Sequence, residues 1–170
     1  MAFGGPYLGF MACREKMMRK LPGRIVGQTV DADGKTGYVL TLQAREQHIR
    51  REKASSNICS NQALCALAVG VYLAAMGNEG LEKAATQCMS KAHYLANQLT
   101  GAGFAVENKG DFFHEFVTVS SKDTDKVLAA LEKENILGGQ KLDDHRILWC
   151  CTEMNTKEDM DLLVRIVKEV

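Results

Sequence analysis

The sequence lacks net charge, a long apolar run and an N-terminal leader, and each absence argues against a class of protein. Its 21 basic and 21 acidic side chains balance, whereas general binders of nucleic acid or of acidic membranes are normally basic. The longest apolar stretch, from Ala63 to Met76, has fourteen residues; this is too short to span a bilayer and is typical of a buried core helix. The chain opens with Gly4-Gly5-Pro6 in place of a basic segment and an apolar core, so we predict no signal peptide. We therefore expect a cytoplasmic protein with no membrane or nucleic-acid partner.

The sequence also lacks a Cys-x-x-Cys pair, although it contains six cysteines. Without such a pair a structural zinc site is not expected. Cys150 and Cys151 are adjacent and would point to opposite faces of a strand. We predict six reduced thiols, several of them buried as small apolar groups.

Four scattered histidines form neither a metal set nor a catalytic triad. His93, on a predicted helix, is expected to be solvated. His114 alternates with phenylalanines and is expected to point to one face of a sheet. His48 lies among arginines, where a site residue and a hydrogen-bonded structural histidine are both open. No metal site is predicted.

The start of the chain is unusual for a natural domain. Residues 3–13 are predicted to form a loop that leads into a short buried strand, with nothing before it to supply a partner. We therefore expect a fragment of a longer protein. Gly4 and Gly5 would let backbone donors approach an anion, but their spacing is not that of a nucleotide-binding loop, so a simple turn is also open.

Turn residues divide the first half of the chain into short elements. A short helix over 14–21 is stopped by Pro22 and Gly23. Residues 25–42 are predicted to form a hairpin, because a turn signal over 31–37 separates two alternating segments. A helix over 61–76 then ends at Gly77.

From Asn78 onward the order of predicted elements is helix, strand, strand, helix, strand, helix. The predicted strands cover residues 104–107, 111–120 and 145–152, and the last two helices begin near Asp123 and Thr156. A small sheet with helices on one face accommodates that order and buries each apolar stripe. The stripe expected to point inward from the first helix comprises Leu81, Ala84, Ala85, Cys88, Met89, Ala92, Leu95, Ala96 and Leu99.

The run from Arg45 to Leu64 is the most informative part of the sequence. It combines Arg45, Arg50 and Arg51 with small hydroxyl and amide residues, which suit close approach to a ligand. Guanidinium groups bind carboxylate or phosphate through two hydrogen bonds. Glu46 and Glu52 leave an anion site and a salt-bridged subunit contact equally open.

This run and two shorter ones resemble a known family. Residues 5–9, 22–27 and 40–64 closely resemble the glycine decarboxylase P-protein, in the subunit 1 form of the two-subunit bacterial enzyme, which is equivalent to the N-terminal half of the fused form. The resemblance continues to the end of the chain and indicates a C-terminal fragment of that subunit.

The resemblance implies an α/β fold, that of pyridoxal-phosphate-dependent transferases of the aspartate aminotransferase type (fold type I). Residues 1–60 would be the end of the large domain and a linker with the hairpin. Residues 61–77 would be a connecting helix, and residues 78–170 the C-terminal small α/β domain.

The resemblance also implies an activity, glycine dehydrogenase (decarboxylating) of the glycine cleavage system. Glycine is decarboxylated on pyridoxal 5'-phosphate, and the aminomethyl group passes to the lipoyl H-protein. The Schiff-base lysine would lie in the sister subunit, subunit 2, so no catalytic residue is expected in this chain. The fragment alone is expected to be inactive, to lack the cofactor and to self-associate.

Two groups of site residues follow from the resemblance. The cofactor-proximal loop would contain Gly4 and Gly5. The shared cleft or subunit interface would contain Arg45, His48, Arg50, Arg51, Ser56 and Asn57. The alternatives are a docking module for the sister subunit or the H-protein, and another fold-type-I enzyme such as a cysteine desulfurase or an aminotransferase.

Overall fold

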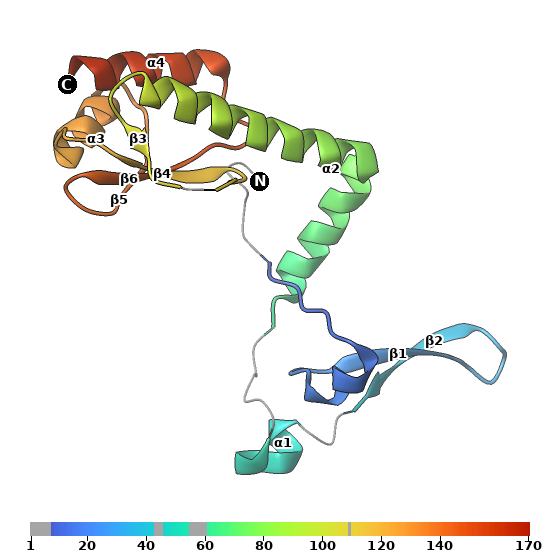
Figure 1. The fold of residues 1–170 in the computed structure, drawn as a ribbon. Helices are drawn as coiled ribbons and strands as arrows, with labels where there is room; N and C mark the ends of the chain where they lie inside the picture. The colour runs from blue at the N-terminus through green and yellow to red at the C-terminus, as the bar shows by residue number, and fades with distance from the viewer. Residues whose placement is uncertain (1–7, 43–45, 55–60, 109) are drawn as a thin grey trace. The chain divides into compact units, whose positions relative to one another are not determined.

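The structure is a computed structural model that describes residues 8–42, 46–54, 61–108 and 110–170. The chain divides into two compact units, one within Tyr7–Val69 and the other comprising Gly70–Val170. Each has its own sheet, and the two sheets share no strand (Figure 1).

The first unit contains the predicted hairpin. Strands β1 (Ile25–Val30) and β2 (Thr36–Thr41) pair antiparallel, with Ile25 opposite Thr41. The Asp31 carboxylate closes the loop, because its Oδ1 accepts from the backbone N–H groups of Asp33 and Lys35, both at 2.9 Å. Gly34 supplies the positive φ of 76° that the turn requires. The hairpin prediction is therefore confirmed.

The segment before the hairpin differs from its prediction. A 3-10 helix, η2 (Glu15–Lys20), replaces the expected helix and buries no side chain. Residues 8–13 form no strand, and Phe10 is 96% exposed. The expected buried strand is wrong because β1 and β2 pair only with each other, so no described strand is available to these residues.

Helix α2 (Ala63–Thr100) begins where the Asn61 side chain accepts from the Ala63 N–H at 3.0 Å. Gly77 interrupts it with φ 63° and ψ −176°, as its sequence position predicts. The expectation that residues 63–76 are a buried core helix is wrong, since the buried side chains of α2 all lie beyond Gly77. By length and composition α2 is apolar enough to cross a membrane. Its fourteen residues before the break, however, extend only roughly 21 Å, against a hydrocarbon thickness of roughly 30 Å.

The second unit is built on a four-stranded antiparallel sheet of order β3-β4-β6-β5. Its strands are β3 (Ala105–Val106), β4 (Glu115–Val119), β5 (Gln140–Lys141) and β6 (Arg146–Cys150). Helices α2, α3 (Thr124–Lys133) and α4 (Lys157–Glu169) lie on one face, as predicted (Figure 1). The two-residue strand β5 was not predicted, and β3 and β4 are shorter than expected.

The core lies between that face and the helices. Alternate residues of β4 and β6 point into it, namely Phe116, Thr118, Ile147 and Trp149, and all are at most 2% exposed. Met160, Leu163, Val164 and Val167 of α4 are buried against them, as their spacing predicts. From α2 only Ala92, Leu95, Ala96 and Leu99 are buried. The inward placement expected for Leu81, Ala85 and Met89 is wrong, because all three are exposed, Leu81 and Met89 by more than 40%.

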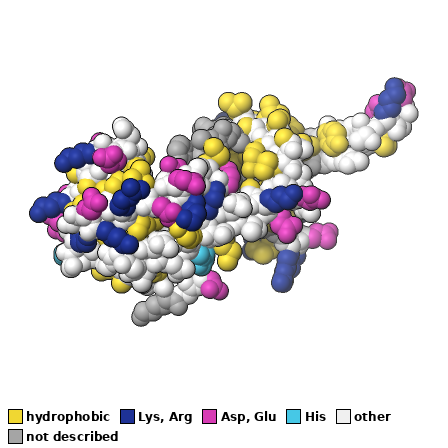
Figure 2. Space-filling view, turned by 90° about the horizontal axis from the view of Figure 1, so that it is seen from above, with side chains coloured by type: hydrophobic (Ala, Val, Ile, Leu, Met, Phe, Trp, Pro, Cys, Tyr) yellow, Lys and Arg dark blue, Asp and Glu magenta, His cyan; other side chains and the backbone are white. Residues whose placement is uncertain are grey.

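Capping residues start the last two helices. The Asp123 carboxylate accepts from the backbone N–H groups of Asp125 and Lys126 at the start of α3. The Thr156 hydroxyl accepts from the Asp159 N–H at 3.1 Å at the start of α4. Figure 2 shows acidic and basic side chains interspersed over the visible face of the molecule, in keeping with the zero net charge.

Candidate functional site

Of the site residues predicted from the sequence, three lie in the described part of the chain. His48 and Arg50 are on helix α1 (Gln47–Arg50), and Arg51 opens the 3-10 helix η4 (Arg51–Lys53). All three are exposed. Gly4, Gly5, Arg45, Ser56 and Asn57 lie outside the described residues, so their predicted roles remain predictions.

Arg51 has a backbone conformation that is unusual for a residue with a side chain. Its φ is 53° and its ψ is −125°, where α1 passes into η4. Such a conformation costs about 1–3 kcal/mol and persists where surrounding structure requires it, often at functional sites. This feature sets Arg51 apart from Arg50, which is helical.

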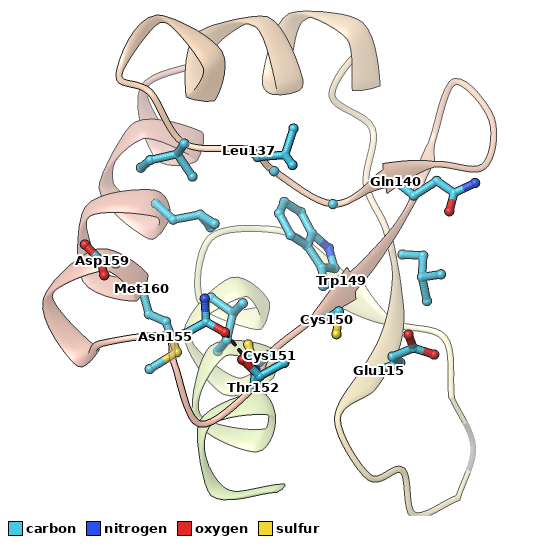
Figure 3. A pocket seen from close by; sticks show the side chains of 16 residues that line it. Glu115, Leu137, Gln140, Trp149, Cys150, Cys151, Thr152, Asn155, Asp159 and Met160 are labelled. Atoms are coloured by element: carbon cyan, nitrogen blue, oxygen red, sulfur yellow. Dashed lines mark hydrogen bonds between the residues drawn. The ribbon is translucent and has the colours of Figure 1, made fainter. Parts of the chain in front are cut away.

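A separate cavity of about 380 Å³ lies in the second unit (Figure 3). Its walls come from the end of β6, the Gly138–Gly139 segment before β5, and the start of α4. Gly139 permits close approach of strands, because a Cβ there would lie 2.3 Å from the Leu148 carbonyl oxygen. Leu137, fully exposed, lies at the cavity beside these glycines.

The polar groups at the α4 side of this cavity have structural roles. The Asn155 Oδ1 accepts from the Thr152 backbone N–H at 2.7 Å, as the dashed line in Figure 3 marks. The Asp159 carboxylate accepts from the Thr156 hydroxyl at 2.6 Å within the helix cap. These contacts hold the turn between β6 and α4.

Cys150 and Cys151 line the cavity, and their thiols and that of Cys88 have raised pKa values. Burial raises the pKa of Cys151 to about 12. Burial, with the neighbouring Glu115 charge, raises the pKa of Cys150. Burial also raises the pKa of Cys88, whose thiol donates to the Glu153 carboxylate at 3.3 Å. Because the thiolate is the reactive form, covalent cysteine catalysis is not supported here.

Four described lysines of this unit are charged structural donors and do not provide an anchor for an aldehyde cofactor. Lys91 donates to the Glu153 carbonyl oxygen and Lys122 to that of Val167, each at 2.6 Å. Hydrogen bonds from Lys141 to Asp125 and Asp144 raise its pKa to about 12, and the bond from Lys157 to Asp161 raises the pKa of that lysine. An anchoring amine must lose its charge. No lysine is among the described residues that line the cavity.

The surroundings of His93 and His114 were not predicted from the sequence pattern. His93 is not solvated as expected, since its ring stacks on Phe112 at 4.1 Å and its Nε2 lies 2.9 Å from the Phe112 carbonyl oxygen. His114 lies beside Glu115 and Cys150 at one end of β4 and β6. The bend over residues 113–114, which brings His114 to that side, has no signal in a strand-like alternation.

Comparison with known proteins assigns the chain to a class. The model of the glycine cleavage system P-protein family matches residues 1–167, so the chain belongs to this family. It is 53% identical to the probable glycine dehydrogenase (decarboxylating) subunit 1 of Desulfitobacterium hafniense and to that of Moorella thermoacetica, over 99% of this chain. It covers 39% of each of these proteins.

A solved structure is also similar. A crystal structure of glycine decarboxylase (P-protein) of the glycine cleavage system, in inhibitor-bound form, matches with a TM-score of 0.89 and 41% identity, covering 99% of this chain and 40% of that one. The predicted family and the predicted α/β fold of a pyridoxal-phosphate-dependent enzyme chain are therefore confirmed. The chain spans about two fifths of the length of the relatives that it matches.

Proposed function

We propose that this chain is part of a glycine dehydrogenase (decarboxylating) that decarboxylates glycine and transfers the aminomethyl group to the lipoyl H-protein. The observation that carries the proposal is the similarity to a P-protein structure along nearly the whole chain, at 41% identity. Fold alone does not define activity, but the relatives at 53% identity carry the same name.

The cofactor that we propose for the assembled enzyme is pyridoxal 5'-phosphate, which serves as an electron sink when a bound amino acid loses carbon dioxide. Lys91, Lys122, Lys141 and Lys157 do not fit as its anchor, because each serves as a charged structural donor. We therefore propose that a sister subunit, subunit 2, supplies the anchor, that the assembly is cytoplasmic, and that this chain alone is inactive.

The arginine-rich run is the part of this chain that we assign to the shared cleft. No side chain of α1 or η4 is buried, and these two helices contain the exposed residues His48, Arg50 and Arg51. The strained backbone at Arg51 supports a role for this position in a larger assembly. Gly4, Gly5, Arg45, Ser56 and Asn57 remain proposed members of the same cleft or of its cofactor-proximal loop.

A chimera tests the proposal in a complete enzyme. The matching two fifths of the Desulfitobacterium hafniense protein is replaced by this chain, and glycine–bicarbonate exchange is measured with subunit 2, pyridoxal phosphate and lipoylated H-protein. We expect exchange within about tenfold of the unaltered enzyme. The isolated chain should show no exchange with the same partners.

Controls separate the activity from the docking role. A deletion of the same segment should abolish exchange. A chimera that binds subunit 2 in a pull-down but fails to exchange bicarbonate would contradict the proposed activity and favour an assembly module. Within an active chimera, R51A should raise the glycine KM or lower kcat at least tenfold, whereas exposed K35A in the hairpin should change neither.

A further inference from the structure

Three side chains that can ligate a metal meet at one end of the second sheet. His114, Glu115 and Cys150 each offer one ligand atom, and these atoms all lie within 4.8 Å of one another. We propose that they bind a divalent cation of the zinc class. This site lies within the Gly70–Val170 unit and does not depend on the proposed enzymatic function.

The register of the sheet brings Glu115 and Cys150 together. They are directly opposite each other on β4 and β6. The Cys151 N–H donates to the His114 carbonyl oxygen at 2.9 Å, and the Ser120 N–H donates to that of His145 at the far end of the ladder. These two bonds mark His114–Cys151 and Ser120–His145 as hydrogen-bonded pairs. Because hydrogen-bonded and non-hydrogen-bonded pairs alternate along the ladder, Glu115 and Cys150 form a non-hydrogen-bonded pair, in which side chains approach most closely.

The position of His114 is set by its neighbours. The bend over residues 113–114 ends the alternation that would otherwise send His114 and Glu115 to opposite faces. The Phe113 ring meets the imidazole edge to face, with centroids 4.8 Å apart. The ring is thereby held beside the start of β4 with its backbone fixed to β6.

The imidazole also has an unmet requirement. Its Nδ1 is buried and has no hydrogen-bond partner among the described residues. A buried polar atom without a partner costs roughly 1–3 kcal/mol, and such an atom in a native structure calls for an explanation, for example an ion. A metal bound through Nδ1 would give this atom the partner that it lacks among the described residues.

The set of donor atoms selects the kind of metal. Imidazole nitrogen and thiolate sulfur with one carboxylate oxygen suit zinc, whereas calcium and magnesium prefer oxygen ligands alone. Bonds of roughly 2.0 Å to nitrogen and 2.3 Å to sulfur at a tetrahedral angle place ligand atoms about 3.5 Å apart. The three side chains must close by about 1 Å, which the exposed Glu115 and Cys150 side chains permit by rotation.

Metal binding requires that Cys150 lose its thiol proton, and it leaves one coordination position of the metal open. The Cys150 thiol gives its proton to solvent as the sulfur–metal bond forms. Three protein ligands leave the fourth tetrahedral position for water or for a donor from another chain. Cys88, the nearby alternative thiol, is instead hydrogen-bonded to Glu153.

A cobalt titration of the purified 170-residue chain tests the site. Co²⁺ bound to a thiolate gives a near-ultraviolet charge-transfer band. We expect this band to saturate at one equivalent and to be displaced by Zn²⁺. C150S should abolish the band, and H114Q and E115Q should each weaken cobalt binding at least tenfold.

Matched variants decide the ligand assignment. C13S changes an exposed cysteine in the other unit and should leave the band unchanged. Thermal unfolding followed by circular dichroism checks that every variant is folded. If C150S does not fold, H114Q takes its place as the variant that tests the site. The absence of a band, a band that survives C150S, or a band lost only in C88S would overturn the proposal.

Discussion

The indole Nε1 of Trp149 donates a 2.7 Å hydrogen bond to the Thr118 hydroxyl between two paired strands of the core. Thr118 is completely buried and Trp149 is 2% exposed. We expect T118V to lower the free energy of unfolding by about 1–3 kcal/mol, because it leaves the indole N–H buried without a partner. Urea unfolding followed by tryptophan fluorescence measures this, since Trp149 is the sole tryptophan.

The matched control for this variant is T118S. It keeps the hydroxyl and loses one methyl group, so its loss should be about 1 kcal/mol and smaller than that of T118V. A T118V variant as stable as the wild type would show that the hydrogen bond does not contribute, whereas losses of equal size would show that the hydroxyl and the methyl group contribute equally at this position.

The lowered pKa of the Asp161 carboxyl predicts how the free energy of unfolding changes with pH. Its carboxylate accepts from Lys157 and from the Tyr94 hydroxyl, which ties α4 to α2, and these bonds lower its pKa from the ordinary value of 3.8. A lowered folded-state pKa means that the stabilisation is present above pH 3.8 and is lost as pH falls through the folded pKa. We expect D161N to lower stability at pH 7 and to show a smaller further loss on acidification, measured by urea unfolding between pH 7 and pH 3. E158Q, an exposed change on the same helix, should keep the wild-type acid dependence.

The close approach at Gly139 predicts a severe effect from one methyl group. A Cβ there would lie 2.3 Å from the Leu148 oxygen and 2.5 Å from the Ile147 side chain. G139A should therefore destabilise the chain by about 1–3 kcal/mol by forcing β5 away from β6. G110A, where a Cβ would have no atom within 4 Å, should be nearly neutral in the same unfolding measurement.

The exposed face of α2 predicts self-association of the isolated chain. Leu64, Leu67 and Val71 are 79%, 65% and 62% exposed at helical spacing. Contiguous apolar surface of this kind favours association. We expect light scattering to show a mass that rises with concentration and L64Q/L67Q/V71Q to shift the chain toward monomer. M89Q, on an exposed position beyond Gly77, is the control, and a wild-type chain that stays monomeric at all concentrations would contradict this expectation.

Local patterns predict most of this fold. The hairpin depends on the Asp31 loop, and the breaks and caps at Gly77, Asp123 and Thr156 depend on residues close in sequence. Strand β5 was missed because its two residues are paired only through β6, which follows it in sequence. The exposure of Leu81 and Met89 was missed because helical spacing marks an apolar face but does not show whether anything covers it.

The candidate sites were less predictable than the fold. The arginine-rich run was identified from its residue types, and the resemblance supplied the family and the shared cleft, but five of the eight predicted site residues lie outside the described residues. The cluster at His114 depends on a bend and on a strand register, and both are set by pairing between segments about 35 residues apart in sequence. Composition and spacing contain no direct signal for either.

The interruption at Gly77 also separates two helical segments whose backbone amides should become accessible to solvent in different ways. Helical hydrogen bonding propagates from residue to residue and ends where one residue leaves the helical conformation. Residues 63–76 have no buried side chain, whereas residues 92–99 are anchored in the core. Amide hydrogens of the first segment should thus exchange with solvent by small local fluctuations, and those of the second only when the whole sheet unit unfolds.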